Sequence, residues 1–320
     1  MKPTSQQQPT PDSNKRDAQL VLPPLTEETI QRAREGLAYA RDRYTNEMTS
    51  EALLSAEAFA DSGSEQKVSG QVRRNVLRTI IHSLFRIKVE YPERIPKTPA
   101  LIAANHLNHI DPFLILSELP ARPYYHILGD ARTLYNNWWK RLFLNLAKGV
   151  IPLERIWKEE IAVIEGAKTG REDLAELAAE IEQYVPQGNS IETLRRLDRI
   201  VQGIFTRGDG IILFPEGRLG RVEGQLELPL KRGSAIYALR SGVPILPVAL
   251  IGTQDLYLKK ELIIRFGEPL TFQQSSRPKP KQIQAVLNEL QAALIAILPK
   301  DYREPEGAKP LRYFLNRMFW

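Results

Sequence analysis

The segment AANHLNHIDPFLIL, residues 103–116, contains half of the four histidines in the chain and lies between two apolar runs. The short apolar run at 100–104 in front of it predicts a buried strand. Asp111 and Pro112 are typical of the first residues of a helix, so we expect a helix over 111–119. A strand that runs directly into a helix, with polar residues in the turn between them, indicates an α/β fold with a candidate site in this turn.

Strand and helix patterns alternate along the rest of the chain. Further strands are expected at 123–128, 149–153, 210–214, 244–252 and 262–270, and helices at 136–147, 231–242 and 279–298. This order predicts an α/β fold with a mostly parallel sheet flanked by helices. The charged helical segment 157–204 interrupts the order and is expected to be a helical insertion.

Composition divides the chain into four parts. Residues 1–24 are rich in Pro, Gln, Ser and Thr, which is typical of a disordered tail. A helical N-terminal extension is expected at 25–68. The main domain should cover 69–298, and a C-terminal tail follows at 299–320.

The composition also limits the available chemistry. The chain of 320 residues has no cysteine, which excludes disulfides, thiolate nucleophiles and cysteine-ligated metals, and fits a reducing compartment such as the cytoplasm. No apolar run approaches the roughly 20 residues of a membrane-spanning helix. The net charge of +6 indicates an anionic partner, either nucleic acid, a phospholipid surface or a phosphorylated substrate.

Residues 72–88 predict a basic amphipathic helix, with apolar residues at four-residue spacing and arginines mostly elsewhere around it. Such a helix suits the interface of an anionic membrane, with its arginines near lipid phosphates. It equally suits an ordinary surface helix whose apolar stripe faces the core.

Three interpretations suit the polar turn at residues 105–111. His106, His109 and Asp111 are acceptable zinc ligands, but no further ligand pattern accompanies them, so we expect no metal. A histidine held by a carboxylate can accept a proton from an alcohol, which suits His106 with Asp111 and leaves His109 as the competing base. In the third interpretation Asp111 is simply a helix N-cap. Because no protein nucleophile is evident, the proton-transfer interpretation describes direct acyl transfer to a hydroxyl of a substrate.

A second motif, GIILFPEGRLGR, covers residues 210–221. A buried strand leads to a turn at Glu216 and Gly217, and Arg218 follows it. Backbone N–H groups near a glycine, beside guanidinium groups, suit an anionic oxygen such as that of a phosphate. A plain turn with solvated arginines is the alternative.

Together the motifs resemble the glycerophospholipid acyltransferase family, the PlsC-like enzymes that acylate glycerol 3-phosphate or lysophospholipids. The turn at 105–111 is similar to the first conserved block of that family, and 214–218 is similar to the third. KGVIPLER at 148–155 resembles the second block, and GVPILPVAL at 242–250 resembles the fourth. All four occur in the family's order, over roughly residues 75–270.

The resemblance implies an acyltransferase that moves a fatty acyl group from acyl-CoA or acyl-carrier protein to a hydroxyl of a lysophospholipid, foremost 1-acylglycerol 3-phosphate. It makes His106 the general base and Asp111 its orienting partner. The residues implied in acceptor binding are Arg155, Glu216, Gly217 and Arg218. The fourth block, with Val243, Pro244 and Pro247, is expected to shape the nearby pocket, and neither a cofactor nor a metal is implied.

The sequence departs from the family pattern at positions that concern the acceptor rather than the reaction. Asn108 stands at a frequent serine, and Pro152 and Glu154 replace the usual Ile-Asp before the arginine of the second block. In the third block Leu219 and Gly220 come after Arg218, where the commonest continuation is Thr, Arg and Ser after the glycine.

Lipid substrates would also explain the positive charge. No nucleic-acid-binding motif competes, so we expect an anionic membrane surface as partner, no nucleic acid, and a cytoplasmic protein peripherally associated with the membrane. From the sequence two other functions stay open, namely a peripheral membrane lipid-binding protein without turnover and a His/Asp metal hydrolase.

Overall fold

The computed structural model describes residues 22–63, 68–186, 188 and 190–319. The tail expected at 1–24 falls almost wholly outside these residues. The described residues form two compact units, the smaller comprising 22–37 with Ile156–Tyr184 and the larger comprising the described residues of 38–155 and 185–319. Each unit has a buried core of its own.

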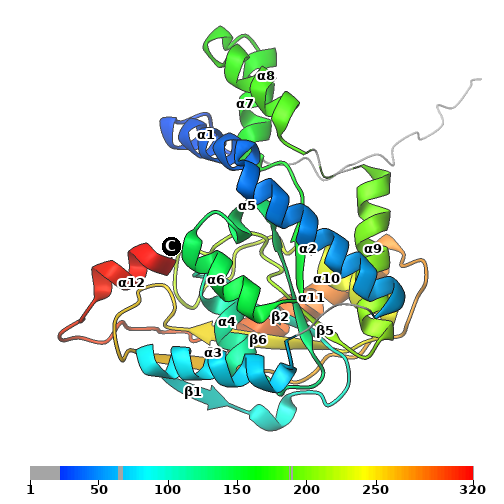
Figure 1. Cartoon of the computed structure of the whole chain (residues 1–320), viewed down its shortest axis with the longest axis vertical. Coiled ribbons are helices and arrows are strands. Elements are labelled where there is room, and N and C mark those ends of the chain that lie inside the picture. Colours follow the sequence, from blue (N-terminus) through cyan, green and yellow to red (C-terminus); the bar gives the residue numbers. More distant parts are fainter. Residues whose placement is uncertain (1–21, 64–67, 187, 189, 320) are drawn as a thin grey trace, which may run out of the picture. The chain divides into compact units, whose positions relative to one another are not determined.

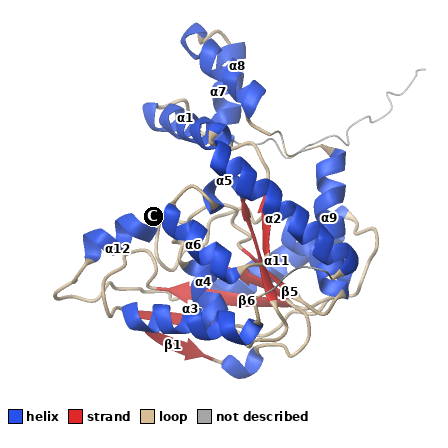
Figure 2. Ribbon diagram, viewed as in Figure 1, coloured by secondary structure: helices blue, strands red, loops and turns tan. Residues whose placement is uncertain are grey.

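A seven-stranded sheet forms the centre of the larger unit (Figures 1 and 2). The strands, in chain order, are β1 (Arg86–Glu90), β2 (Leu101–Ala104), β3 (Tyr125–Asp130), β4 (Val150–Leu153), β5 (Gly210–Leu213), β6 (Ile245–Ile251) and β7 (Glu261–Phe266). Their order across the sheet is β1-β7-β6-β2-β5-β3-β4. All neighbours are parallel except β6 and β7. The expected α/β fold with a mostly parallel sheet is thereby confirmed.

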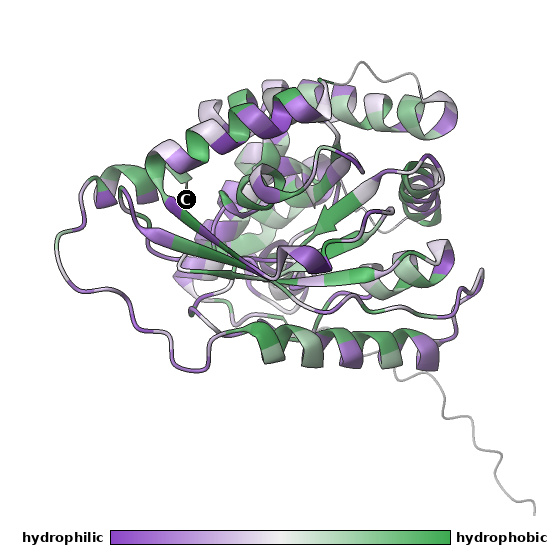
Figure 3. Cartoon of the chain, turned by 90° about the horizontal axis from the view of Figure 1, so that it is seen from below, coloured by the Kyte–Doolittle hydropathy of each residue, from purple (hydrophilic) through white to green (hydrophobic). Residues whose placement is uncertain are grey.

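Helices cover both faces of the sheet, and Figure 3 shows the largely hydrophobic strands between them. Alternation along β2 explains the two cores, because Ile102 and Ala104 join one apolar cluster while Leu101 and Ala103 join the other. The helices of the first cluster are α3 (Gly70–Leu84), α4 (Asp111–Glu118), α6 (Trp138–Ala147) and α12 (Arg312–Phe319). Those of the second are α2 (Arg43–Ser62), α9 (Ile191–Thr206), α10 (Gly233–Ser241) and α11 (Pro280–Ile297).

The described part of the smaller unit is helical. It contains most of α1 (Glu27–Arg41), together with α7 (Lys158–Lys168), the 3₁₀ turn η2 (Glu172–Leu174) and α8 (Ala175–Tyr184). Its core includes the fully buried Ala33, Val163 and Ile181. Helix α9, which ends the expected insertion, belongs to the larger unit, where Arg196 pairs with Glu57 of α2. The domain boundaries inferred from the sequence stay predictions.

Two expectations about the 72–88 segment are corrected. The helix ends at Leu84, and the next residues form strand β1, because RIKVE alternates charged and apolar side chains and pairs with β7. The apolar face of α3 packs inward, with Leu77 and Ile81 fully buried in the core. Helix α3 therefore packs on the core as the ordinary surface helix of the two alternatives does, although Val72 at its start is 51% exposed.

The last strand also differs from expectation. It ends at Phe266 instead of reaching residue 270, and it runs antiparallel to β6. The connection at 252–260 is too short to hold the crossover helix that a parallel pair requires. In the described part of the chain, no helix has both the length and the apolar content needed to cross a bilayer.

The inward face of α3 can be tested by a pair of substitutions. Leu77→Ala should lower the free energy of unfolding by about 2–5 kcal/mol, because it leaves a cavity at a fully buried position. Val72→Ala, on the same helix at a position that is 51% exposed, should change it by less than about 0.5 kcal/mol. Urea denaturation of both variants measures the difference, and equal losses would contradict the packing described.

Candidate active site

The candidate site forms where two neighbouring strands end. β2 and β5 are parallel, and Ala103 pairs with Leu213. Their carboxyl ends therefore meet at one edge of the sheet, where α/β folds place their binding sites. This topology brings the turn after β2 and the turn after β5 together, although His106 and Glu216 are 110 positions apart.

Asn105 fixes the start of the first turn. Its side-chain Nδ2 donates to the carbonyl of Leu250 at 2.9 Å, and its Oδ1 accepts the N–H of Leu250 at 2.7 Å. The amide thus pairs with β6 as a strand residue would, immediately after β2 ends at Ala104. The next residue, His106, leaves the sheet from a fixed point.

Asp111 holds this turn together through one oxygen. Its Oδ2 accepts hydrogen bonds from the backbone N–H groups of Leu107 at 2.7 Å and Asn108 at 2.9 Å, and it lies 2.9 Å from Nδ1 of His106. The side chain is fully buried. The N-cap interpretation is corrected, because the N-cap of α4 is Ile110 and Asp111 is the first helical residue, with its carboxylate directed back onto the turn.

This geometry selects the tautomer of His106. An oxygen that already accepts two N–H bonds acts as an acceptor toward the ring, so Nδ1 carries the proton and Nε2 is left as the basic nitrogen. The ring stacks on Phe214 with centroids 4.0 Å apart, and the side chain is 16% exposed. The ring of His109, the competing base, lies edge-on to that of His106 at 6.1 Å.

Glu216 connects the two turns. Its Oε1 accepts the backbone N–H of His106 and its Oε2 accepts that of Glu227, both at 2.7 Å. The residue is 3% exposed, and burial raises the pKa of its carboxyl to about 7 against the opposing effect of the two N–H donors. The carboxylate therefore binds the chain's own backbone on both sides.

Gly217 and Arg218 lie beside this carboxylate. Gly217 has a φ of 67°, in the left-handed region that favours glycine, and its N–H donates to the carbonyl of Phe214 at 3.0 Å. A Cβ at this position would lie 2.7 Å from the Cε of Lys231. The side chain of Arg218 is 55% exposed and pairs with Glu227.

Arg155 lies apart from these turns. It follows β4, which is three strands from β2, and at about 4.8 Å per strand this places the two strand ends roughly 14 Å apart. Its Nε pairs with Asp130 at 2.7 Å, and its carbonyl accepts a hydrogen bond from Arg132 at 2.8 Å. The structure therefore brings His106, Asp111 and Glu216 together and leaves Arg155 at a separate part of the same edge.

The fourth block is placed differently from the expectation. Val243 and Pro244 precede β6, whose first residue Ile245 pairs with Leu101. They lie at the amino ends of the strands, opposite the turn that carries His106. These two residues therefore do not shape a pocket beside it, and the expectation for them is corrected.

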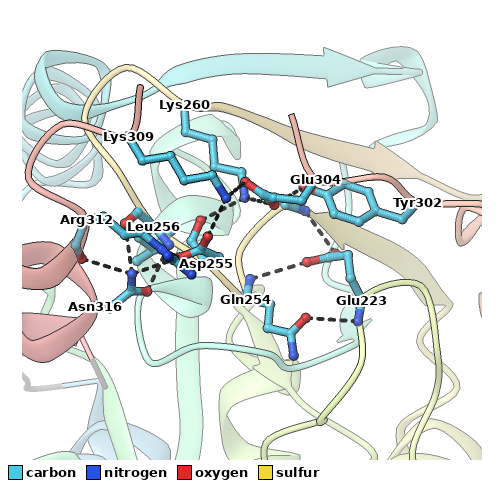
Figure 4. Close-up of polar contacts among 11 residues, drawn as sticks. Glu223, Gln254, Asp255, Leu256, Lys260, Tyr302, Glu304, Lys309, Arg312 and Asn316 are labelled. Atoms are coloured by element: carbon cyan, nitrogen blue, oxygen red, sulfur yellow. Dashed lines mark hydrogen bonds and ion pairs between the residues drawn. The ribbon is translucent and has the colours of Figure 1, made fainter. Parts of the chain in front are cut away.

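Sequence reasoning missed a second carboxylate, which is half-buried on the loop after β5. Glu223 accepts the N–H groups of Gly252 at 2.9 Å and Gln254 at 3.3 Å, and burial raises the pKa of its carboxyl to about 7 (Figure 4). Both partners follow β6, which neighbours β2. The loop that carries Glu216 is thus attached a second time to the same edge of the sheet.

A polar network continues from this attachment to the C-terminal segment (Figure 4). Asp255 accepts hydrogen bonds from Arg312 at 2.7 Å, Lys309 at 2.9 Å and Asn316 at 3.0 Å. Burial alone would raise the pKa of Asp255, but these three donors hold it at about 2. The network fixes the start of α12 beside the loop at 252–260.

Among the described residues, no group of three or more His, Cys, Asp or Glu side chains is placed to hold a metal ion. The site consists of an imidazole held by a buried carboxylate, at the carboxyl edge of a parallel sheet. The fold and the site together define a class of α/β proteins with a candidate general base at the carboxyl edge of the sheet.

Comparison with known proteins narrows this class. Residues 86–251 match the family described as Acyltransferase, and because the match covers more than half of the chain, the chain belongs to this family. The chain is 28% identical to 1-acyl-sn-glycerol-3-phosphate acyltransferase of Cocos nucifera over 129 residues, which are 40% of this chain and 41% of that protein. It is 30% identical to the alpha form of Mus musculus over 86 residues, or 27% of this chain and 29% of that protein. The chain thus spans less than half the length of these relatives.

Similarity also extends to a solved structure. The crystal structure of PlsC, the 1-acyl-sn-glycerophosphate (LPA) acyltransferase of Thermotoga maritima, matches with a TM-score of 0.39 and 18% sequence identity. The match covers 80% of this chain and 98% of that one.

The buried carboxyl of Glu216 predicts a specific dependence of stability on pH. Its pKa is raised from 4.5 to about 7, so its contribution to the free energy of unfolding is full below about pH 4.5 and is lost as the pH rises through 7. Glu216→Gln removes this titration. The difference in unfolding free energy between wild type and variant, from urea denaturation, should therefore change by about 2–3 kcal/mol between pH 5 and pH 8.

Glu223→Gln provides a parallel measurement, because its carboxyl has a pKa raised in the same direction by the same cause. The double variant should lose the pH dependence of both residues. A difference between wild type and variant that is equal at the two pH values would contradict the raised pKa.

Proposed function

We propose that this member of the acyltransferase family transfers a fatty acyl group from a thioester, acyl-CoA or acyl-carrier protein, to a hydroxyl of 1-acylglycerol 3-phosphate. The single observation that supports a base-catalysed transfer is the 2.9 Å contact between Nδ1 of His106 and Asp111. Relatives with matching segments carry names that specify 1-acyl-sn-glycerol-3-phosphate as substrate.

In the proposed reaction, Nε2 of His106 accepts the proton of the acceptor hydroxyl as its oxygen attacks the thioester carbonyl. A C–O bond forms and the carbonyl electrons move to an oxyanion. When the oxyanion collapses, the C–S bond breaks and the thiolate leaves with the electron pair. His106 then returns its proton to the thiolate, so the base is regenerated. Asp111 keeps the ring in the required tautomer throughout and stabilises the imidazolium.

Glu216 has a positioning role in this proposal. Because its oxygens accept the N–H groups of His106 and Glu227, it orients the turn that carries the base instead of binding the acceptor directly. Gly217 allows the turn that places this carboxylate. Arg218 is the residue of the loop that we assign to the acceptor phosphate, because half of its side chain is exposed and guanidinium groups bind phosphate well. We also assign Arg155 to the acceptor, although it lies three strands from β2 at the carboxyl edge of the sheet.

An acceptor with a fatty chain is presented by a membrane, so we propose that the protein works peripherally at an anionic membrane surface. The net charge of +6 supports attraction to such a surface. The absence of cysteine from the sequence supports a reducing compartment, and we propose the cytoplasm.

Removing the base tests the reaction. His106→Ala should lower kcat by roughly 10²–10⁴-fold, the range of general base catalysis, and Asp111→Asn should lower it by a similar factor because the tautomer is no longer fixed. Release of CoA from an acyl-CoA in the presence of 1-acylglycerol 3-phosphate measures both. His109→Ala is the matched control and should stay within a few-fold of wild type.

Equal CoA release by wild type and His106→Ala would contradict the proposed function. Binding of lipid without release by wild type would favour a lipid-binding protein without turnover. Activity that disappears with a chelator and returns with zinc would favour the metal hydrolase.

The acceptor assignment has its own test. Arg218→Ala should raise KM for 1-acylglycerol 3-phosphate about tenfold, corresponding to the loss of one charge-assisted contact, and should leave kcat nearly unchanged. Arg218→Lys keeps the charge without the fork geometry and should be intermediate. A screen of lysophospholipids with and without a terminal phosphate measures the preference. An unchanged KM for the phosphorylated acceptor would contradict this role of Arg218.

A further inference from the structure

Helices α6 and α12 share a buried aromatic contact. The ring of Phe319 lies 4.9 Å from that of Trp139 and 6.5 Å from that of Phe143, in edge-to-face arrangements. All three side chains are nearly fully buried. The two helices, far apart in the sequence, therefore lie side by side in the larger unit.

Large apolar side chains cover the outer sides of both helices. Trp138 is 72% exposed and Leu142 is 60% exposed, and their spacing of four residues places them on one side of α6. On α12, Tyr313 is 79% exposed and Phe314 is 59% exposed. We name these four residues, with the 54% exposed Leu311 just before α12, the α6/α12 surface. The buried contact between the two helices places these exposed residues on neighbouring elements, and large exposed apolar residues on neighbouring elements mark a site of interaction.

The exposed positive charge of this surface lies mainly at Arg317 of α12. Neither WWKRLFLNLA of α6 nor RYFLNRMF of α12 contains an Asp or a Glu, but Lys140 of α6 is buried, Arg141 pairs with Asp42, and Arg312 pairs with Asp255. The side chains of Arg312 and Arg317 are exposed. A partner that fits this surface has an apolar region for the exposed aromatic residues and anionic groups for the exposed arginine.

We propose that the α6/α12 surface binds the interface of an anionic phospholipid bilayer, an inference that rests on the proposed function in taking the acceptor to be a lipid. Trp and Tyr have amphipathic rings that favour the headgroup level, and Arg pairs with lipid phosphates. A protein partner of matching chemistry would have to supply acidic groups around an apolar centre. The bilayer supplies both without a specific shape.

The surface is linked to the catalytic turn through one helix. Phe113 of α4 contacts Trp139 at 6.4 Å and Phe143 at 5.2 Å between ring centroids. Helix α4 begins with Asp111, the partner of His106. Binding through α6 and α12 therefore holds the base close to the interface from which the acceptor comes.

Vesicle binding by the full chain tests this surface. Wild type should bind vesicles of equal parts phosphatidylcholine and phosphatidylglycerol and should bind pure phosphatidylcholine more weakly. The triple variant Trp138→Ser, Tyr313→Ser, Phe314→Ser should bind the anionic vesicles at least roughly tenfold more weakly. Arg317→Gln should lose roughly fivefold on anionic vesicles and little on phosphatidylcholine.

Exposed apolar residues elsewhere provide the matched control. Ile191 and Leu194 of α9 are 68% and 53% exposed, and replacing both by Ser should leave vesicle binding unchanged. Circular dichroism and thermal melting check that each variant is folded. If the triple variant binds vesicles as wild type does, or if both sets of variants lose binding equally, the proposal is overturned.

Two further outcomes separate this proposal from its alternatives. In one outcome the wild type does not bind vesicles but dimerises in sedimentation velocity, whereas the triple variant is monomeric. This would show that a second copy of the chain binds the α6/α12 surface and would overturn the proposed bilayer binding. Turnover of a short-chain, water-soluble acceptor tests the proposed function independently. If vesicle binding fails and turnover is retained, only the proposed membrane surface is overturned. If vesicles are bound without turnover, only the proposed acyl transfer is overturned.

Discussion

The carboxylate of Glu216 joins two turns that the sequence separates by 110 positions. It accepts the N–H of His106 on one side and that of Glu227 on the other, each at 2.7 Å. The carbonyl of His106 accepts in turn from Gly220 of the same loop at 2.6 Å. The backbone of the base-bearing residue is thus held at both its polar groups, while Asp111 orients the ring and holds the following turn.

The contacts of Glu216 hold the turn of His106 in position but lower the stability of the fold. In the charged form, each oxygen of Glu216 accepts one N–H. In the protonated form, one oxygen carries a proton and faces an N–H donor, so one of the two contacts weakens. Burial favours the protonated form, with a pKa raised to about 7, whereas the double contact requires the charged one. The fold therefore gives up stability near neutral pH to hold the turn in place, as strained or destabilised groups at functional sites often do.

The local geometry around His106 could be predicted from sequence because it is encoded in neighbouring residues. A strand, a turn and a helix starting at Asp111 leave few ways to place a carboxylate five residues from a histidine. The positions of Arg155 and Pro244 could not be predicted in this way. Their distance from the turn depends on the order of strands and on which end of β6 each block occupies, and apolar periodicity does not report either.

Ambiguity of a different kind affected α3. An amphipathic stripe beside arginines fits a core and a lipid interface equally, because both accept the same apolar face. Only the packing of Leu77 and Ile81 decides between them. For α6 the sequence pattern does not separate exposed from buried aromatic residues, since only the structure distinguishes Trp138, which is 72% exposed, from the buried Trp139.

One departure from the family pattern, Gly220 in the third block, is explained by the contacts of the turn that carries His106. Gly220 lies where the sequence leaves the commonest form of the third block, and its N–H reaches the carbonyl of His106. A Cβ there would lie 3.1 Å from Cδ2 of Leu107 and 3.3 Å from the carbonyl oxygen of His106, so a side chain would push the loop away from the turn. At Gly220, the departure from the family pattern thus supports the turn that carries His106. Under the proposed function, differences in acceptor are to be sought at the exposed Arg218, which lies between Glu216 and Gly220, and not in the residues that hold the turn.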